Sequence, residues 1–170
     1  MCDIDVLFDG NVQTQFTIVK NFPNGGVYSE HLRIDKNKSD YKLVKNVGIE
    51  FARMGKIVKA NAEIKFDTEE YKKVFGALVG TKYERKCPDL LVDNKFYEVK
   101  SYEPPFKSKK IKKMLRFGLY QSNNLILNNN KGASDRYIKK LIYDRIRLKQ
   151  AVNEVWLYEK GKIRLLYKKQ

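Results

Sequence analysis

Residues 87–103 read Cys-Pro-Asp-Leu-Leu-Val-Asp-Asn-Lys-Phe-Tyr-Glu-Val-Lys-Ser-Tyr-Glu, and this stretch decides the fold. Apolar residues stand on both sides of Asp93-Asn94, a pair that tolerates the positive backbone angles of a tight hairpin turn. We therefore predict two antiparallel strands, 89–92 and 95–101, joined by a two-residue turn.

The position of this turn decides which side chains share a face. It places Asp89 opposite Glu98, and Lys100 falls on the same face because side chains alternate along a strand. Opposed carboxylates repel each other and would destabilise a purely structural hairpin. The same arrangement suits a divalent cation held beside a water molecule. Sliding the pairing by two residues sets Asp89 opposite Lys100 and keeps the shared face, whereas a three-residue loop does not guarantee it.

The length and the cysteine content describe a simple protein. A chain of 170 residues is most simply one domain, with a β-rich segment at 1–38 and a core at 39–170. Its two cysteines form neither a disulfide framework nor a zinc pattern. We find no apolar run long enough to span a membrane and no signal peptide, so we expect a soluble, cytoplasmic protein.

The net charge of +15, from 35 Lys and Arg against 20 Asp and Glu, indicates a polyanionic partner. Nucleic acid is the first expectation, and an anionic membrane surface is the second. A surface that only confers solubility is the alternative, but such surfaces mix the two signs and keep a modest net charge.

Hydrophobic periodicity and turn residues predict an alternation of strands and helices. We expect strands at 5–8, 15–20, 26–34, 57–65, 124–128, 155–158 and 163–167, besides the central hairpin. We expect helices at 40–54, 69–78, 108–122 and 133–149. This order predicts an α/β fold with a mixed sheet flanked by helices.

Two polar residues fall on the apolar stripes of predicted helices. Glu50 lies on the stripe of helix 40–54, and Gln121 lies on that of helix 108–122. A buried unpaired carboxylate is costly, so Glu50 is either an ion-paired or snorkelling residue or a group directed into a site. Gln121 is either hydrogen-bonded near the helix end or part of the same site.

The carboxylates are hard oxygen ligands, and no soft ligand set competes with them. Such ligands suit Mg²⁺ or Mn²⁺ rather than zinc. A metal of this kind can activate water and neutralise charge that develops on a phosphate. Lys100, two residues from Glu98, can orient the water or stabilise that charge.

Pro88-Asp89 followed by Glu98-Val99-Lys100 resembles the signature of the PD-(D/E)XK nuclease superfamily. The resemblance extends from about Ser39 to Leu166 and implies a restriction-endonuclease-like core with a β-rich N-terminal extension. The chain most resembles nuclease domains at the C-termini of bacterial contact-dependent growth inhibition and related polymorphic toxins. Several of those domains cleave tRNA, and others cut DNA.

The resemblance implies a role for each candidate residue. The catalytic set is Glu50, Asp89, Glu98, Lys100 and Gln121. The metal, Mg²⁺ or Mn²⁺, would be held by Asp89, Glu98 and the backbone carbonyl of Val99, with Glu50 completing the site directly or through water. Lys100 would position the attacking water, and Gln121 would steady Lys100 or the phosphate.

The expected function is that of a metal-dependent endonuclease, with RNA, in particular tRNA, favoured over DNA. The expected nucleic-acid contacts are Lys82, Arg85, Lys86, Tyr102, Lys109, Lys110, Lys112, Lys113 and Arg116. The alternatives are a non-catalytic nucleic-acid-binding module with the same fold and a DNA nuclease of a mobile element. A basic face of this kind also suits an acidic partner, such as an immunity protein.

Overall fold

The structure is a computed structural model that describes residues 15–170. The strands are β1 (Phe16–Asn21), β2 (Val27–His31), β3 (Ile57–Ala60), β4 (Leu90–Val92), β5 (Lys95–Lys100), β6 (Asn124–Asn128), β7 (Glu154–Glu159) and β8 (Lys162–Lys168). The helices are α1 (Tyr41–Arg53), α2 (Glu69–Phe75), the short 3₁₀ helix η3 (Gly76–Leu78), α3 (Lys109–Gly118) and α4 (Asp135–Arg147). The strand expected at 5–8 lies outside the described residues.

The eight strands form one sheet in which the spatial order follows the chain from β1 to β8. The pairs β2–β3, β5–β6 and β6–β7 are parallel, and the remaining neighbours are antiparallel. The prediction of an α/β fold with a mixed sheet flanked by helices is confirmed. Strands β1 and β2 continue this sheet beyond β3, so the N-terminal segment contributes its edge.

The central hairpin has the register that its turn residues predict. Val92 pairs with Lys95 across the turn, and Asp93 and Asn94 have φ angles of 44° and 67°. Positive φ at both central residues is the mark of the type I′ turn that suits a two-residue hairpin. Strand β4 begins at Leu90, which leaves Asp89 directly before it.

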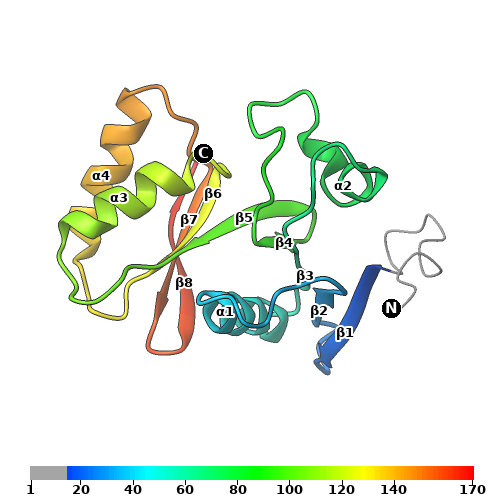
Figure 1. Ribbon diagram of the computed structural model, residues 1–170. Coiled ribbons are helices and arrows are strands. Elements are labelled where there is room, and N and C mark those ends of the chain that lie inside the picture. Colours follow the sequence, from blue (N-terminus) through cyan, green and yellow to red (C-terminus); the bar gives the residue numbers. More distant parts are fainter. Residues whose placement is uncertain (1–14) are drawn as a thin grey trace.

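Helices cover the two faces of the sheet (Figure 1). Helix α1 packs on one face, where Val47 and Phe51 share a core with Tyr97 and Val99 of β5. Helices α3 and α4 lie side by side on the other face and enclose a second core with β6, β7 and β8. Because side chains alternate along β5, Glu98 and Lys100 lie on the face opposite α1.

The α2 segment builds a third, smaller core on that same opposite face. Tyr71 and Phe75 of α2 are fully buried there, and Phe96 of β5 packs against them. Glu98 and Lys100 follow Phe96 at two-residue steps along β5. They therefore lie between the α2 segment and helix α3.

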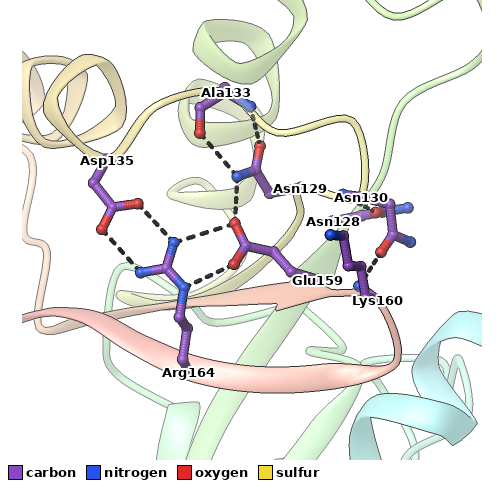
Figure 2. A network of polar contacts seen from close by, with 8 residues as sticks. All are labelled: Asn128, Asn129, Asn130, Ala133, Asp135, Glu159, Lys160 and Arg164. Carbon is purple, nitrogen blue, oxygen red and sulfur yellow. Dashed lines mark hydrogen bonds and ion pairs between the residues drawn. The ribbon is translucent and has the colours of Figure 1, made fainter.

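A polar network fixes the connection between β6 and α4 to the β7–β8 hairpin (Figure 2). Buried Asn129 bonds to both backbone groups of Ala133 and donates to Glu159 Oε1 at 2.6 Å. Arg164 forms two bonds to Asp135, at 2.6 and 2.9 Å, and two to Glu159. Bidentate charged contacts of this kind impose geometry as well as attraction, so the network holds the end of β6 and the start of α4 against the β7–β8 hairpin.

Several predicted elements differ from those observed, and the strand expected at 26–34 spans only Val27–His31. The strand expected at 57–65 ends at Ala60, because the next residue, Asn61, turns its backbone and side-chain bonds to the segment before β4. Helix α3 ends at Gly118 rather than at 122. On α1, Met54 is exposed, and the buried face runs through residues 44, 47, 48, 50, 51 and 52.

No helix within residues 15–170 is long and apolar enough to cross a membrane.

Candidate active site

Four of the predicted site residues line one cavity of about 370 Å³, hereafter the catalytic cavity. They are Asp89, Glu98, Lys100 and Gln121. The remaining lining residues are Lys38, Asp40, Glu63, Arg85, Lys86 and Cys87. Strand β5, the segment before β4 and the turn after α3 thus bring together groups that are distant in the sequence.

The carboxylates and the lysine meet as the hairpin register predicts. Asp89 Oδ2 accepts a hydrogen bond from the backbone N–H of Val99 at 2.8 Å. Lys100 Nζ contacts Glu98 Oε1. Glu98 is only 5% exposed, and its second oxygen, Oε2, is buried without a hydrogen-bond partner among the described residues. One carboxylate oxygen is therefore left for a group that residues 15–170 do not supply.

Burial makes both carboxyl groups reluctant to ionise. The pKa of Glu98 is raised, first by burial and then by the charge of Asp89, although Lys100 opposes the change. The pKa of Asp89 is also raised by burial, against the bond from Val99 and the charge of Lys100. A cation bound between the two groups would relieve both penalties.

The donor set fits Mg²⁺ or Mn²⁺. Residues 15–170 contain no group of three or more His, Cys, Asp or Glu side chains arranged for a metal, so a cation would rely on Asp89 and Glu98. Mg²⁺ is commonly held by one or two carboxylates, with water and substrate phosphate completing its shell. The Val99 carbonyl points to the same strand edge as its N–H, hence toward Asp89.

Asn61 holds the first carboxylate in place, and the sequence analysis missed it. Its backbone N–H donates to the carbonyl of Asp89 at 2.9 Å, and its Nδ2 donates to the carbonyl of Pro88 at 2.8 Å. These two bonds fix the segment that carries Asp89 against the end of β3. A lone asparagine after a strand gives no sequence signal for this role.

Lys100 is positioned by close packing from α3. A Cβ atom on Gly118 would lie 2.8 Å from Leu125 Cδ2 and 3.3 Å from Lys100 Cγ. Only glycine at position 118 allows helix α3 to lie this close to β5 and β6, because any side chain there would meet Leu125 and Lys100. The chain after Lys100 is tied as well, because Asn128 donates to Ser101 Oγ at 3.0 Å.

Gln121 owes its place to the residue that follows it. Buried Ser122 donates through Oγ to the carbonyl of Phe96 at 2.8 Å, which ties the turn after α3 to β5. The Gln121 backbone N–H closes the same turn onto the carbonyl of Gly118 at 2.8 Å. Its half-buried side chain is therefore held at the wall of the catalytic cavity.

Gly118→Ala is expected to lower activity by displacing Lys100. Overpacking costs about 1–3 kcal/mol, and a shift of about 1 Å in a reacting group can cost about 100-fold in rate, so the few tenths of an ångström required here predict a loss of about tenfold. Rates of nucleic-acid cleavage and thermal melts measure both effects. Gly76→Ala, at a position with open space around its Cβ, is the matched control, and equal rates for the two variants would contradict the packing role.

Comparison with solved structures finds one fold neighbour of this chain. It belongs to a structure described as a CdiA-CT/CdiI toxin and immunity complex from Burkholderia pseudomallei. The alignment has a TM-score of 0.52 and 16% sequence identity, and it covers 81% of this chain and 91% of that chain. The similarity is one of fold. No protein-family model and no curated protein matches the chain.

Glu50 does not join the catalytic cavity, which corrects the expectation from its helix. Its Oε1 pairs with Arg53 at 3.0 Å, and its Oε2 lies 3.4 Å from Lys162 of β8. Glu50 is thus the ion-paired glutamate that the sequence left as the alternative. Ten residues of helix, about 15 Å at 1.5 Å per residue, separate it from Asp40, the residue beside the start of α1 that lines the cavity.

Glu50→Gln is therefore expected to leave the rate of cleavage unchanged. The variant weakens two ion pairs with largely exposed partners, and such pairs contribute at most about 1 kcal/mol each. Parallel cleavage assays and thermal melts on the variant and the original chain check this. Abolished cleavage in Glu50→Gln would contradict this assignment and show that Glu50 acts in the site.

The predicted nucleic-acid contacts form two groups around the cavity. Arg85 and Lys86 line the catalytic cavity itself. Tyr102, Lys110 and Lys113 line a neighbouring cavity of about 310 Å³, which also contains Lys100. The other predicted contacts, Lys82, Lys109, Lys112 and Arg116, are exposed on the surface. Contact with nucleic acid remains a prediction for all of them.

Asp40, Lys38 and Glu63 also line the catalytic cavity and had no part in the sequence prediction. Lys38 Nζ lies 2.7 Å from Glu63 Oε1, so these two form an ion pair at the cavity wall. Asp40 occupies the cap position of α1, but its side chain makes no capping bond in the described structure. Only the folding of the loops around α1 and β3 brings these groups to Asp89.

Proposed function

We propose that this chain is a metal-dependent nuclease with a restriction-endonuclease-like PD-(D/E)XK core, acting as a toxin. The observation that carries the proposal is the buried carboxylate of Glu98, with one oxygen unpartnered among the described residues, beside Asp89 and Lys100. The chemistry of these three groups matches hydrolysis of a phosphodiester, and the net charge of +15 suits a polyanionic substrate.

Asp89, Glu98 and the Val99 carbonyl would hold Mg²⁺ or Mn²⁺. When bound, such an ion supplies a water of lowered pKa and neutralises charge on the phosphate. Lys100 contacts Glu98 Oε1, which leaves Oε2 for the ion, and its ammonium would face the phosphate. Gln121 lies at the same cavity wall and donates an amide hydrogen to a phosphate oxygen.

The reaction is the hydrolysis of one P–O ester bond. The oxygen of water forms a bond to phosphorus, the ester bond breaks, and the departing oxygen takes up a proton. Lys100 orients the water and stabilises the additional negative charge of the transition state. The two products together contain the atoms of one water molecule more than the substrate.

RNA, and tRNA in particular, is the favoured substrate class, with DNA as the second. The preference rests on the resemblance to tRNA-cleaving toxin domains. Arg85 and Lys86 beside the carboxylates would contact the phosphates nearest the cleaved bond, and the exposed lysines of α3 would contact the backbone further along. DNA cleavage without RNA cleavage would favour the nuclease of a mobile element.

An acidic immunity protein is the proposed protein partner. The neighbour in fold comes from a structure described as a toxin and immunity complex, and a strongly basic chain offers an acidic protein the charge complementarity that speeds association. Such a partner would cover the basic residues around the catalytic cavity and exclude nucleic acid.

The test incubates the purified chain with tRNA, total RNA and plasmid DNA, with Mg²⁺ or Mn²⁺ and with chelator. Cleavage is expected with either metal and not in chelator, and Asp89→Ala is expected to remove it. Asp144→Asn, at a half-buried carboxylate on α4 that pairs with Arg147, is the matched control and should cleave normally. Cleavage that persists in chelator or in Asp89→Ala would refute the mechanism.

A non-catalytic nucleic-acid-binding module gives a different result in the same assay. It would bind each nucleic acid with an affinity that falls steeply with salt and would leave all of them intact with either metal. The unpartnered Glu98 oxygen argues against this alternative, because a binding surface does not need a buried carboxylate without a partner.

A further inference from the structure

A second cavity, of about 240 Å³, adjoins the catalytic cavity and has no part in the proposed chemistry. The two cavities share Lys38, Asp40, Glu63, Cys87 and Asp89. Arg33, Tyr41 and Asn61 line only the second one, hereafter the Asn61 cavity. A substrate whose phosphate lies at Asp89 therefore has room to place its adjoining nucleoside in the Asn61 cavity.

Asn61 carries an acceptor that the described chain leaves unused. The residue is 8% exposed, and its Nδ2 is engaged by the carbonyl of Pro88. Its Oδ1 is buried and has no hydrogen-bond partner within the described residues. A buried polar atom normally has a partner, so an unpaired carbonyl oxygen in a cavity wall indicates a ligand that donates a hydrogen bond.

Asp40 supplies two more acceptor oxygens to the same cavity. It occupies the cap position of α1, yet its side chain makes no capping bond in the part of the chain that the structure describes. It is also not part of any metal-ligating group of three among those residues. The carboxylate is therefore free to accept hydrogen bonds from a ligand.

The remaining wall residues suit a planar base. Tyr41 donates its hydroxyl to Glu30 Oε1 at 2.8 Å, which fixes the ring that lines the cavity. Lys38 and Arg33 supply hydrogen-bond donors beside the acceptors. Unpaired bases in proteins are typically stacked on aromatic rings and hydrogen-bonded along their Watson–Crick edges.

We propose that the Asn61 cavity binds an unpaired guanine of the substrate, next to the phosphate that is cleaved. This inference rests on the proposed nuclease function. Guanine is the base whose Watson–Crick edge presents two adjacent donors, N1–H and N2–H₂, which a carboxylate accepts together. Its neighbouring O6 is an acceptor, which suits Lys38. Cytosine, adenine and uracil each offer a single donor group on that edge.

The proposal also restricts the substrate to a single-stranded site. A guanine within a duplex uses its Watson–Crick edge for its partner base and cannot present it to Asp40. The nucleotide in the Asn61 cavity must therefore come from a loop, a bulge or an end, where bases can be splayed out. On the other side of the cleaved phosphate, the substrate strand would continue past Lys100, which also lines the cavity next to α3.

The test measures binding in chelator, where no cleavage occurs. Fluorescence anisotropy is recorded for labelled single-stranded ten-residue oligonucleotides of uridine, or of thymidine for the DNA arm, with one central G, A, C or U/T. The guanine oligonucleotide is expected to bind at least about fivefold more tightly, the lower end for a bidentate side-chain contact to a base. Wild-type affinities within twofold of one another for all bases would overturn the proposal without any variant.

Asp40→Asn replaces the carboxylate with an amide of the same shape and removes no capping bond. It is expected to abolish the guanine preference while the other oligonucleotides bind as before. Asp144→Asn, on α4 and outside both cavities, is the control that should retain the preference. An equal loss of affinity for all bases in Asp40→Asn, in a variant with an unchanged thermal melt, would show a general charge effect and overturn the base contact.

The guanine-binding test and the nuclease assay can fail independently of each other. A chain that discriminates guanine but cleaves nothing would refute only the catalytic proposal. A chain that cleaves with metal at sites of random base composition, and binds all oligonucleotides alike, would refute only the guanine site. The RNA and DNA arms show which sugar the site accepts.

Discussion

Replacing Lys100 with methionine is expected to abolish cleavage of nucleic acid while the fold remains intact. Methionine keeps an unbranched side chain against Gly118, where the lysine stem packs, but it has no charge to orient water or to stabilise the transition state. Removal of one preorganised group of this kind costs about 100- to 1,000-fold in rate. Initial rates with Mg²⁺ on the best substrate measure the effect.

A measurement of metal binding distinguishes the proposed role of Lys100 from that of a metal ligand. Lys100 contacts Glu98 Oε1 and places a positive charge beside the oxygen left for a cation, so Lys100→Met is expected to bind Mn²⁺ at least as tightly as the original chain in calorimetry. Lys72→Met, an exposed lysine of α2 paired with Glu69, is the matched control. Weaker Mn²⁺ binding by Lys100→Met, or unchanged cleavage, would be incompatible with the proposed role.

Glu98→Gln is expected to abolish cleavage and, at the same time, to stabilise the metal-free protein above neutral pH. The pKa of Glu98 is raised in the folded chain by burial and by the charge of Asp89. For such a group, the stabilising contribution is fully present below the unfolded-state pKa and is lost as pH rises toward the folded-state pKa. A neutral glutamine has no proton to lose, so the variant escapes this loss.

Thermal melts in chelator at pH 5 and pH 8 test whether Glu98→Gln stabilises the metal-free protein and at which pH. At pH 8 the variant is expected to melt roughly 2–4 °C above the original chain, the shift that about 1 kcal/mol produces in a domain of this size. At pH 5 the difference should shrink, because Glu98 is then largely protonated. Mn²⁺ should stabilise the original chain at pH 8 and have little effect on Glu98→Gln. A lower melting temperature for the variant at pH 8 would contradict the expected cost of the buried charge.

Most of the hairpin and its chemistry could be predicted from the sequence because these are local properties. Asp93-Asn94 has the turn chemistry for a two-residue hairpin, and the alternation of side chains then places Asp89, Glu98 and Lys100 on one face. The structure confirms that register. Gln121 was also predicted near this face, and it lines the same cavity.

Glu50 shows where a helical pattern stops being informative. Periodicity identifies the buried side of α1, but it does not say which face of the sheet that side covers. Helix α1 covers the face of Tyr97 and Val99, and Glu98 lies on the other. The same carboxylate that the pattern directs inward therefore pairs with Arg53 and Lys162.

What the sequence by itself determined is the basic charge, the alternation of strands and helices, and the hairpin that carries the carboxylates and the lysine. Only the tertiary structure decided that Asn61 and Asp40 lie beside that hairpin, because β3 ends next to Asp89 and the start of α1 reaches the same cavity. Turn chemistry and side-chain alternation act between neighbouring residues. The meeting of loops depends on how whole elements pack, which no short stretch of sequence encodes.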